Sequence, residues 1–202
     1  MDLTRVRALL LDMDGTLVES DAAVERAWRA WAREYGLAEE EALALAHGHP
    51  SESTARRLLP GLDDDAVLLA AQRQLDLQYD DLSDVHATAG AYELLDVLAR
   101  RQLPWAVVTS ADVRLARARL GAARIDPPVL VTVEDVSAGK PDPEGYLLAA
   151  RRLGVPPRDC LVVEDSQPGI DAGHAAGMTV AAVRGLLADV PLRNLGQLAQ
   201  AL

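Results

Sequence analysis

Residues 6–16 read Val-Arg-Ala-Leu-Leu-Leu-Asp-Met-Asp-Gly-Thr, a short apolar run that stops abruptly at two acids and a glycine. An uninterrupted apolar run of this length, ended by charged and turn-forming residues, is typical of a buried strand in a parallel sheet. Similar runs recur at residues 105–109, 129–132, 160–164 and 179–183. The sequence therefore predicts a set of short buried strands distributed along the chain.

Helical patterns lie between these runs. Residues 91–101, for example, place Leu94, Leu95 and Leu98 on one apolar stripe. Further helices are expected at residues 112–120, 143–153 and 168–176. Strands that alternate with helices indicate βαβ units. The predicted fold is α/β, a Rossmann-like parallel sheet core with helices on both faces.

One region interrupts this alternation. Between about residue 21 and about residue 84 there is no strand-like run, and the apolar spacing predicts four helices, at residues 23–35, 39–46, 52–59 and 63–79. The acidic cluster Asp63-Asp64-Asp65 follows Gly61 and precedes the last of these helices, so we expect it to cap that helix rather than to bind a metal ion. The predicted domains are a core of residues 1–17 and 86–202, and an inserted four-helix domain of residues 18–85.

Composition restricts the classes of function. The 202 residues carry a formal net charge of −11 and are 50% hydrophobic. This charge disfavours nucleic acid and anionic membrane surfaces as partners, because both attract basic proteins. Cys160 is the single cysteine, so no intramolecular disulfide forms, and no apolar stretch approaches the 18 residues of a membrane helix. We expect a cytoplasmic protein.

The first apolar run ends in Asp12 and Asp14. In open α/β sheets, ligands bind at the carboxyl ends of the strands, which is where this pair lies. Two acids in alternate positions of an extended chain face opposite sides. A sharp turn helped by Gly15 would bring both towards one point. The sequence therefore predicts a polar site at the end of the first strand.

Other strand ends carry matching chemistry. Thr109 and Ser110 precede a helix, where hydroxyls and backbone N–H groups either hold phosphate or cap the helix. Glu164 and Asp165 form a second acid pair, which is costly to bury beside other carboxylates unless a cation neutralises them. Oxygen ligands of this kind favour Mg²⁺. Lys140, the single lysine of the chain, also precedes a predicted helix.

These four elements follow one another along the chain as Asp12-Met13-Asp14-Gly15-Thr16, Thr109-Ser110, Lys140-Pro141 and Glu164-Asp165. This order resembles the haloacid dehalogenase-like (HAD) phosphohydrolase superfamily, over nearly the whole chain. The helical insertion is similar to the small helical cap of that superfamily. Segments at residues 23–28, 47–48, 104–110 and 139–147 resemble bacterial sugar phosphatases and the related enzymes acting on 2-deoxyglucose 6-phosphate, hexitol phosphates and glycerol phosphate.

The resemblance implies Mg²⁺-dependent hydrolysis of small phosphate monoesters through a phospho-aspartate. Asp12 would be the nucleophile, and Asp14 would protonate the departing alkoxide and then accept a proton from the attacking water. The implied metal residues are Asp12, Asp14 through its carbonyl, Asp165 and Glu164. The implied phosphate-binding residues are Thr109, Ser110 and Lys140, and Glu164 would orient either Lys140 or the waters on the metal.

The resemblance leaves alternatives open. A β-phosphoglucomutase-like mutase would share the core motifs and the cap, and would need a second phosphate site, for which Arg56 and Arg57 are candidates. A phosphoglycolate phosphatase would share the same fold and motifs. A catalytically silent phosphate-binding regulator is the alternative outside the enzymes. The expected partner is a small phosphorylated substrate, and we expect a monomer.

Substrate specificity is expected to reside in the cap. The candidate substrate loop contains His47, Gly48, His49 and Ser51, whose imidazole and hydroxyl groups could hydrogen-bond to sugar hydroxyls. Structural roles are the alternatives for the same residues: His47 would cap the preceding helix, and Ser51 would cap the next one.

Overall fold

The computed structural model describes residues 3–46 and 51–202. The chain divides into two compact units. One unit combines Met1–Glu19 with His86–Leu202, and the other is Ser20–Val85. In the described residues, no helix is both long enough and apolar enough to cross a membrane.

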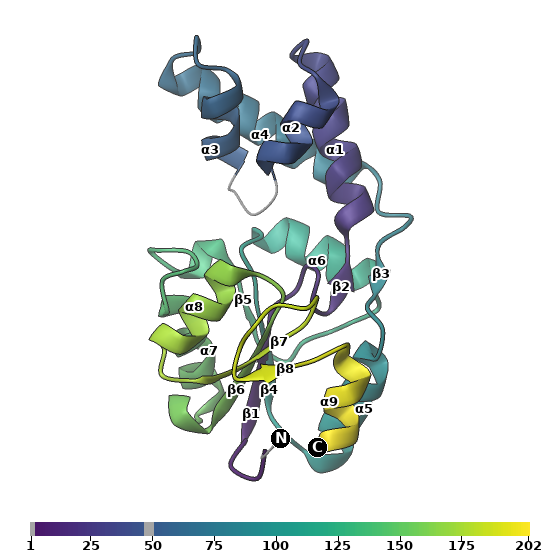
Figure 1. Ribbon diagram of the computed structural model, residues 1–202, viewed down its shortest axis with the longest axis vertical. Helices are drawn as coiled ribbons and strands as arrows, with labels where there is room; N and C mark the ends of the chain where they lie inside the picture. The colour runs from purple at the N-terminus through teal and green to yellow at the C-terminus, as the bar shows by residue number, and fades with distance from the viewer. Residues whose placement is uncertain (1–2, 47–50) are drawn as a thin grey trace. The chain divides into compact units, whose positions relative to one another are not determined.

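The first unit is built on a six-stranded parallel sheet in the order β5-β4-β1-β6-β7-β8 (Figure 1). Its strands are β1 (Ala8–Leu11), β4 (Trp105–Val108), β5 (Leu130–Val131), β6 (Cys160–Glu164), β7 (Thr179–Ala182) and β8 (Val190–Pro191). β1 lies in the middle and pairs with β4 on one side and β6 on the other. The ends of β4, β1 and β6 therefore meet at one edge. The predicted acids and hydroxyls of the core lie at or just after these three ends, and Lys140 lies between β5 and α7 (Glu144–Leu153).

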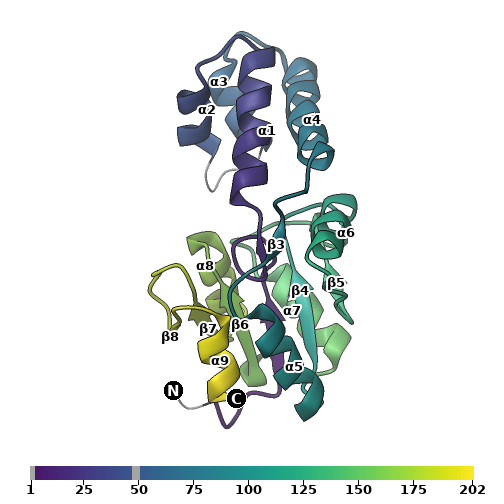
Figure 2. The ribbon, with the colours of Figure 1, turned by 90° about the vertical axis from the view of Figure 1, so that its right-hand side faces the viewer.

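Helices cover both faces of this sheet (Figure 2). The helices of this unit are α5 (Ala91–Arg101), α6 (Val113–Ala122), α7 (Glu144–Leu153), α8 (Gln167–Ala175) and α9 (Leu195–Ala201), with 3-10 turns at Val133–Asp135 and Pro157–Asp159. Ala8 and Leu10 of β1 pack with residues of α7 and α8 in one apolar core. Leu9 and Leu11 point to the opposite face and are fully buried there.

The predicted parallel sheet with helices on both faces is confirmed. No sequence pattern indicated β8, α9 or the short antiparallel ribbon of β2 (Val18–Glu19) and β3 (His86–Ala87). The three strands contain two residues each, which is too short for any periodicity to show. The ribbon carries the chain out of the sheet unit and back into it.

In the residues that the structure describes, the second unit contains four helices, as predicted, and has its own core. They are α1 (Asp21–Glu34), α2 (Glu39–Ala46), α3 (Ser51–Leu58) and α4 (Asp64–Asp80). Trp28 and Trp31 meet edge to face with ring centroids 5.2 Å apart, and the Trp31 indole donates a hydrogen bond to the Ala70 carbonyl. Asp63 accepts a hydrogen bond from the backbone N–H of Ala66 and caps α4, which confirms its predicted role.

Candidate active site

The loop after β1 begins with Asp12, whose side chain is almost completely buried. Its backbone N–H donates to the Val163 carbonyl, so the acid is held at the end of β1. Gly15 adopts a φ of +79°, and a Cβ atom there would lie 1.9 Å from Oδ2 of Asp165. The glycine thus gives the loop its left-handed turn and lets it approach the acid that follows β6.

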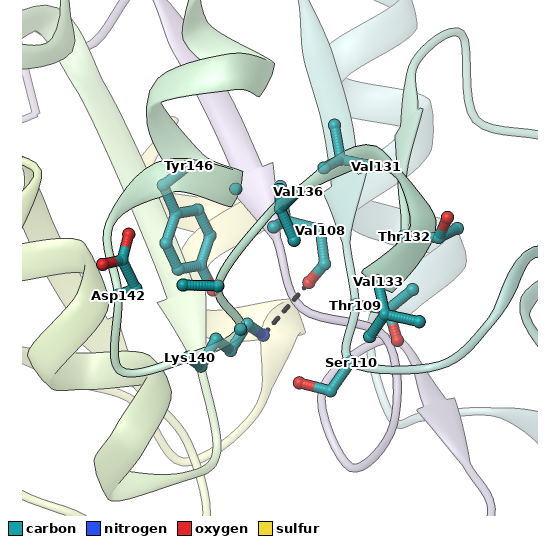
Figure 3. A pocket seen from close by; sticks show the side chains of 13 residues that line it. Val108, Thr109, Ser110, Val131, Thr132, Val133, Val136, Lys140, Asp142 and Tyr146 are labelled. Atoms are coloured by element: carbon teal, nitrogen blue, oxygen red, sulfur yellow. Dashed lines mark hydrogen bonds between the residues drawn. The ribbon is translucent and has the colours of Figure 1, made fainter.

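Lys140 joins this loop to the end of β6. Its ammonium donates to Oδ1 of Asp12 and Oε1 of Glu164, at 2.6 Å each, and to the Val108 carbonyl at 3.1 Å, the contact dashed in Figure 3. An ammonium has three donors, and the protein uses all three. Burial by itself lowers the pKa of Lys140, but attraction to Asp12 and Glu164 outweighs it and raises that pKa well above its usual value. The amine is therefore a fixed cation between two carboxylates.

Glu164 is fully buried, and donors surround both of its oxygens. Oε1 accepts hydrogen bonds from Lys140 and from the Tyr146 hydroxyl, the latter at 2.7 Å. Oε2 accepts from the backbone N–H groups of Asp165 and Ser166 and from the Ser166 hydroxyl. Burial raises the pKa of Glu164, but Lys140 and these hydrogen bonds prevail and hold it below its ordinary value. Glu164 is therefore an anion with a fixed orientation.

Three acids together could hold a metal ion. Ligand oxygens of Asp12, Glu164 and Asp165 all lie within 4.8 Å of one another. Burial, helped by repulsion from Glu164, raises the pKa of Asp165 to about 7 despite the nearby Arg184. Burial also raises the pKa of Asp12 well above its usual value, although Lys140 acts in the opposite direction. The site thus carries more negative charge than its own cations offset, which fits a divalent cation.

The predicted phosphate-binding residues line one small cavity of about 20 Å³, which has room for about one water molecule. Thr109, Ser110 and Lys140 all border it (Figure 3). Thr109 is buried, and its hydroxyl accepts a hydrogen bond from the backbone N–H of Ala111 at 3.0 Å, whereas Ser110 is exposed. The structure thus brings these three residues together around one cavity, and Lys140 also contacts Asp12.

The Asp14 side chain is not part of the acid cluster. Its Oδ2 lies 2.8 Å from Nη1 of Arg119, a residue of α6 whose side chain is only 3% exposed. Neither Arg119 nor Tyr146 was predicted from the sequence as a site residue. Arg119 did carry a signal, because it lies among the buried residues Leu115, Ala116 and Leu120 at helical spacing, where a charge requires a partner. Tyr146 gave no such signal, since tyrosine is common in cores.

The predicted substrate loop is only partly described. His47, Gly48 and His49 lie outside the described residues. Ser51 is the first residue of α3, and its hydroxyl donates to Oε1 of Gln74 on α4 at 2.7 Å. The role of Ser51 in substrate binding stays a prediction.

Gly169, in the first turn of α8, lies against the Glu164 carboxylate. A Cβ at this position would lie 1.8 Å from Oε1 of Glu164, which cannot move aside without breaking its hydrogen bonds. We expect Gly169→Ala to lower the free energy of unfolding by about 1–3 kcal/mol, the usual range for overpacking a core. Urea denaturation would measure this. The control is Gly121→Ala on α6, where the added Cβ meets nothing within 4 Å; equal stability of the two variants would contradict the prediction.

The chain was compared with known proteins. It is 42% identical over 191 residues to hexitol phosphatase A of Escherichia coli (strain K12), covering 94% of this chain and 88% of that protein. It is 34% identical to 2-deoxyglucose-6-phosphate phosphatase 1 of Saccharomyces cerevisiae, covering 83% and 76%. The crystal structure of a putative β-phosphoglucomutase from Thermotoga maritima superimposes with a TM-score of 0.78 at 27% identity, covering 97% and 98%. The family model of haloacid dehalogenase-like hydrolases matches residues 6–177, and the chain belongs to this family.

Proposed function

We propose that this phosphoric monoester hydrolase acts on sugar or polyol phosphates with Mg²⁺ as its cofactor, through a phospho-aspartate on Asp12. The observation that carries the proposal is the Lys140 ammonium, fixed at 2.6 Å from both Asp12 and Glu164 at the carboxyl edge of the sheet. A cation held on one oxygen of a buried carboxylate neutralises charge at the point where a phosphate dianion must approach. The hexitol and 2-deoxyglucose phosphate relatives support the substrate class.

In the proposed reaction, an oxygen of Asp12 attacks phosphorus and the ester bond to the alcohol breaks. Asp14 gives a proton to the departing oxygen, and later takes one from the water that hydrolyses the phospho-aspartate. Thr109, with neighbouring backbone N–H groups and Ser110, would bind phosphoryl oxygens. Because all three donors of Lys140 are already used, a phosphoryl oxygen would have to replace one of its protein acceptors.

Mg²⁺, when bound, would offset the repulsion between the nucleophile and the dianionic ester. We assign its carboxylate ligands to Asp12 and Asp165 and add the carbonyl of Asp14. Glu164 accepts hydrogen bonds at both oxygens, which leaves it little capacity for direct ligation. We therefore assign Glu164 to orienting Lys140.

A phosphosugar mutase is the second candidate, favoured by the Thermotoga maritima structure. A mutase needs cationic groups for a second phosphate. Arg56, one of the two candidates for that role, already pairs with Glu52 at 3.3 Å and Asp64 at 2.6 Å. Its guanidinium is therefore engaged by its own helix and the next one, which weighs against Arg56 as the second phosphate site.

The test is release of inorganic phosphate from hexitol, hexose, glycerol and glycolate phosphates, with Mg²⁺ and with EDTA. We expect Mg²⁺-dependent release, fastest from a hexitol or sugar phosphate. Formation of an isomer without phosphate release would favour the mutase. If release is fastest from phosphoglycolate, the substrate class is phosphorylated short acids. We also propose a monomeric, cytoplasmic enzyme; gel filtration tests its oligomeric state.

Asp165→Asn is expected to make the metal-free protein more stable at pH 8. The pKa of Asp165 is about 7 in the fold, against about 3.9 in an unfolded chain, so the fold binds this proton more tightly. The resulting stabilisation of the folded state is complete below about pH 4 and is lost as the pH rises through 7. Above that pH, the ionised carboxylate lowers the free energy of unfolding. Removing that charge should add on the order of 2 kcal/mol at pH 8.

Thermal unfolding with EDTA at pH 5 and pH 8 would measure this effect. In the wild type, Mg²⁺ should raise the melting temperature at pH 8, and in Asp165→Asn this gain should disappear. Asp126→Asn is the matched control, because Asp126 is exposed on the loop after α6. If Asp165→Asn is no more stable than the wild type at pH 8 in EDTA, the carboxylate carries no uncompensated charge.

A further inference from the structure

The described part of α6 contains one deeply buried arginine. Arg119 is 3% exposed and lies on the same side of the helix as Leu115, Ala116 and Leu120. A guanidinium in such a place is costly unless an anion compensates it. The compensating carboxylate is that of Asp14, whose Oδ2 lies 2.8 Å from Nη1 of Arg119. The Asp14 side chain itself is 31% exposed, so the pair joins the core to the surface of the site.

The position of α6 gives this pair a defined orientation. The helix follows Thr109 and Ser110 after β4, and Asp112 caps it by accepting a hydrogen bond from the Leu115 N–H at 2.8 Å. Arg119 therefore projects from an element anchored at the same sheet edge as Asp12. A carboxyl group has two equivalent oxygens until a neighbour distinguishes them. A guanidinium on Oδ2 distinguishes the two oxygens, so a proton exchanged by this carboxyl group would be carried on Oδ1.

We propose that Arg119 is a positioning residue, which orients the Asp14 carboxyl group for proton transfer to the leaving oxygen. This inference rests on the proposed function. In the first step, the bond from Asp12 to phosphorus forms as the ester bond breaks, the electron pair stays on the alcohol oxygen, and Oδ1 of Asp14 supplies its proton. In the second step, water attacks phosphorus and gives its proton to Asp14, and the bond to Asp12 breaks.

The role predicts a dependence on the leaving group. An alkoxide is too basic to depart unprotonated, whereas 4-nitrophenolate is a stable anion at neutral pH and needs no acid. General acid catalysis contributes about 10²–10⁴-fold. A misplaced acid therefore slows hydrolysis of an alkyl phosphate and leaves hydrolysis of 4-nitrophenyl phosphate nearly unchanged. A variant that only unfolded part of the protein would lower both rates by the same factor.

The experiment compares kcat/KM for sorbitol 6-phosphate and 4-nitrophenyl phosphate in the wild type, Arg119→Met and Arg119→Lys. We expect Arg119→Met to lose about 10- to 100-fold on the alkyl ester and less than about 3-fold on the aryl ester. Arg119→Lys keeps the charge, and it is the variant to measure if Arg119→Met does not fold. It should show a smaller loss on the alkyl ester with the same selectivity. Arg117→Met, an exposed arginine of the same helix, is the control for the change in net charge.

A double-mutant cycle then tests whether Arg119 acts through Asp14. Asp14→Asn should show the same selectivity, and adding Arg119→Lys to it should cause little further loss on the alkyl ester. Equal losses on both esters, or additive losses in the double variant, would overturn the positioning role while leaving the phosphatase intact. A wild type that hydrolyses neither ester in Mg²⁺ would overturn the proposed function, and this inference with it.

Discussion

Asp12→Asn is expected to abolish phosphate release, with kcat/KM falling by about 10⁴-fold or more, as when an enzyme loses its nucleophile. An amide oxygen is a poor nucleophile towards phosphorus, yet it can still accept the hydrogen bond from Lys140. Asn also has nearly the same shape as Asp, which matters at a buried strand end. We therefore expect the variant to fold like the wild type and to lose its chemistry.

The measurement is phosphate release from the best substrate, together with thermal unfolding. A second readout follows the phosphoryl group: acid-quenched wild type should carry it on the peptide containing Asp12, and the variant should not. Asp96→Asn serves as the control, because Asp96 is an exposed acid on α5 that does not line the cavity. Retention of more than about 1% of wild-type activity would show that Asp12 is not the nucleophile.

The sequence predicted the parallel sheet and several of the residues that lie at its carboxyl edge. Each apolar run was short and ended in polar residues, so the parallel sheet and its active edge followed from the period and from chain order. Asp12 and Lys140 are 128 positions apart. The family resemblance implied that both belong to one site, and both lie at strand or helix ends that such a sheet brings to one edge.

The other features of the site depend on tertiary contacts that no sequence pattern predicts. The Tyr146 hydroxyl and the backbone N–H groups of Asp165 and Ser166 determine how Glu164 is held, and this follows from tertiary packing. Likewise, the partner of Arg119 depends on how α6 lies against the loop after β1. The sequence identified which residues carry charge, whereas the structure identified which charges face each other.

Lys140→Cys is the second variant with a large expected effect. The substitution leaves Asp12 and Glu164 without the cation that lies 2.6 Å from each. Removing one partner of a buried ion pair costs about 3–5 kcal/mol, so the metal-free variant should be markedly less stable. Activity should fall by about 10²–10³-fold, the range observed when one stabilising charge or donor is removed from an active site.

The same variant allows the amine to be restored chemically. Treatment with 2-bromoethylamine converts the introduced cysteine into a lysine analogue that again carries an ammonium, whereas iodoacetamide adds a neutral amide of similar size. Cys160, the native cysteine, is buried within β6, and its burial raises the pKa of the thiol to about 11, so it should not react at pH 8. Alkylation of the wild type controls for this.

We expect aminoethylation to recover at least a tenth of wild-type activity, and carboxamidomethylation to recover none. Such a result would show that Lys140 contributes through its charge and not through packing, because both reagents fill the space that lysine leaves. Recovery with both would mean that Lys140 acts by filling the cavity beside Thr109, and recovery with neither, in a folded protein, would mean that the side chain must be lysine itself. Only the first outcome agrees with a fixed cation that offsets the charge of Asp12 as a phosphate dianion approaches.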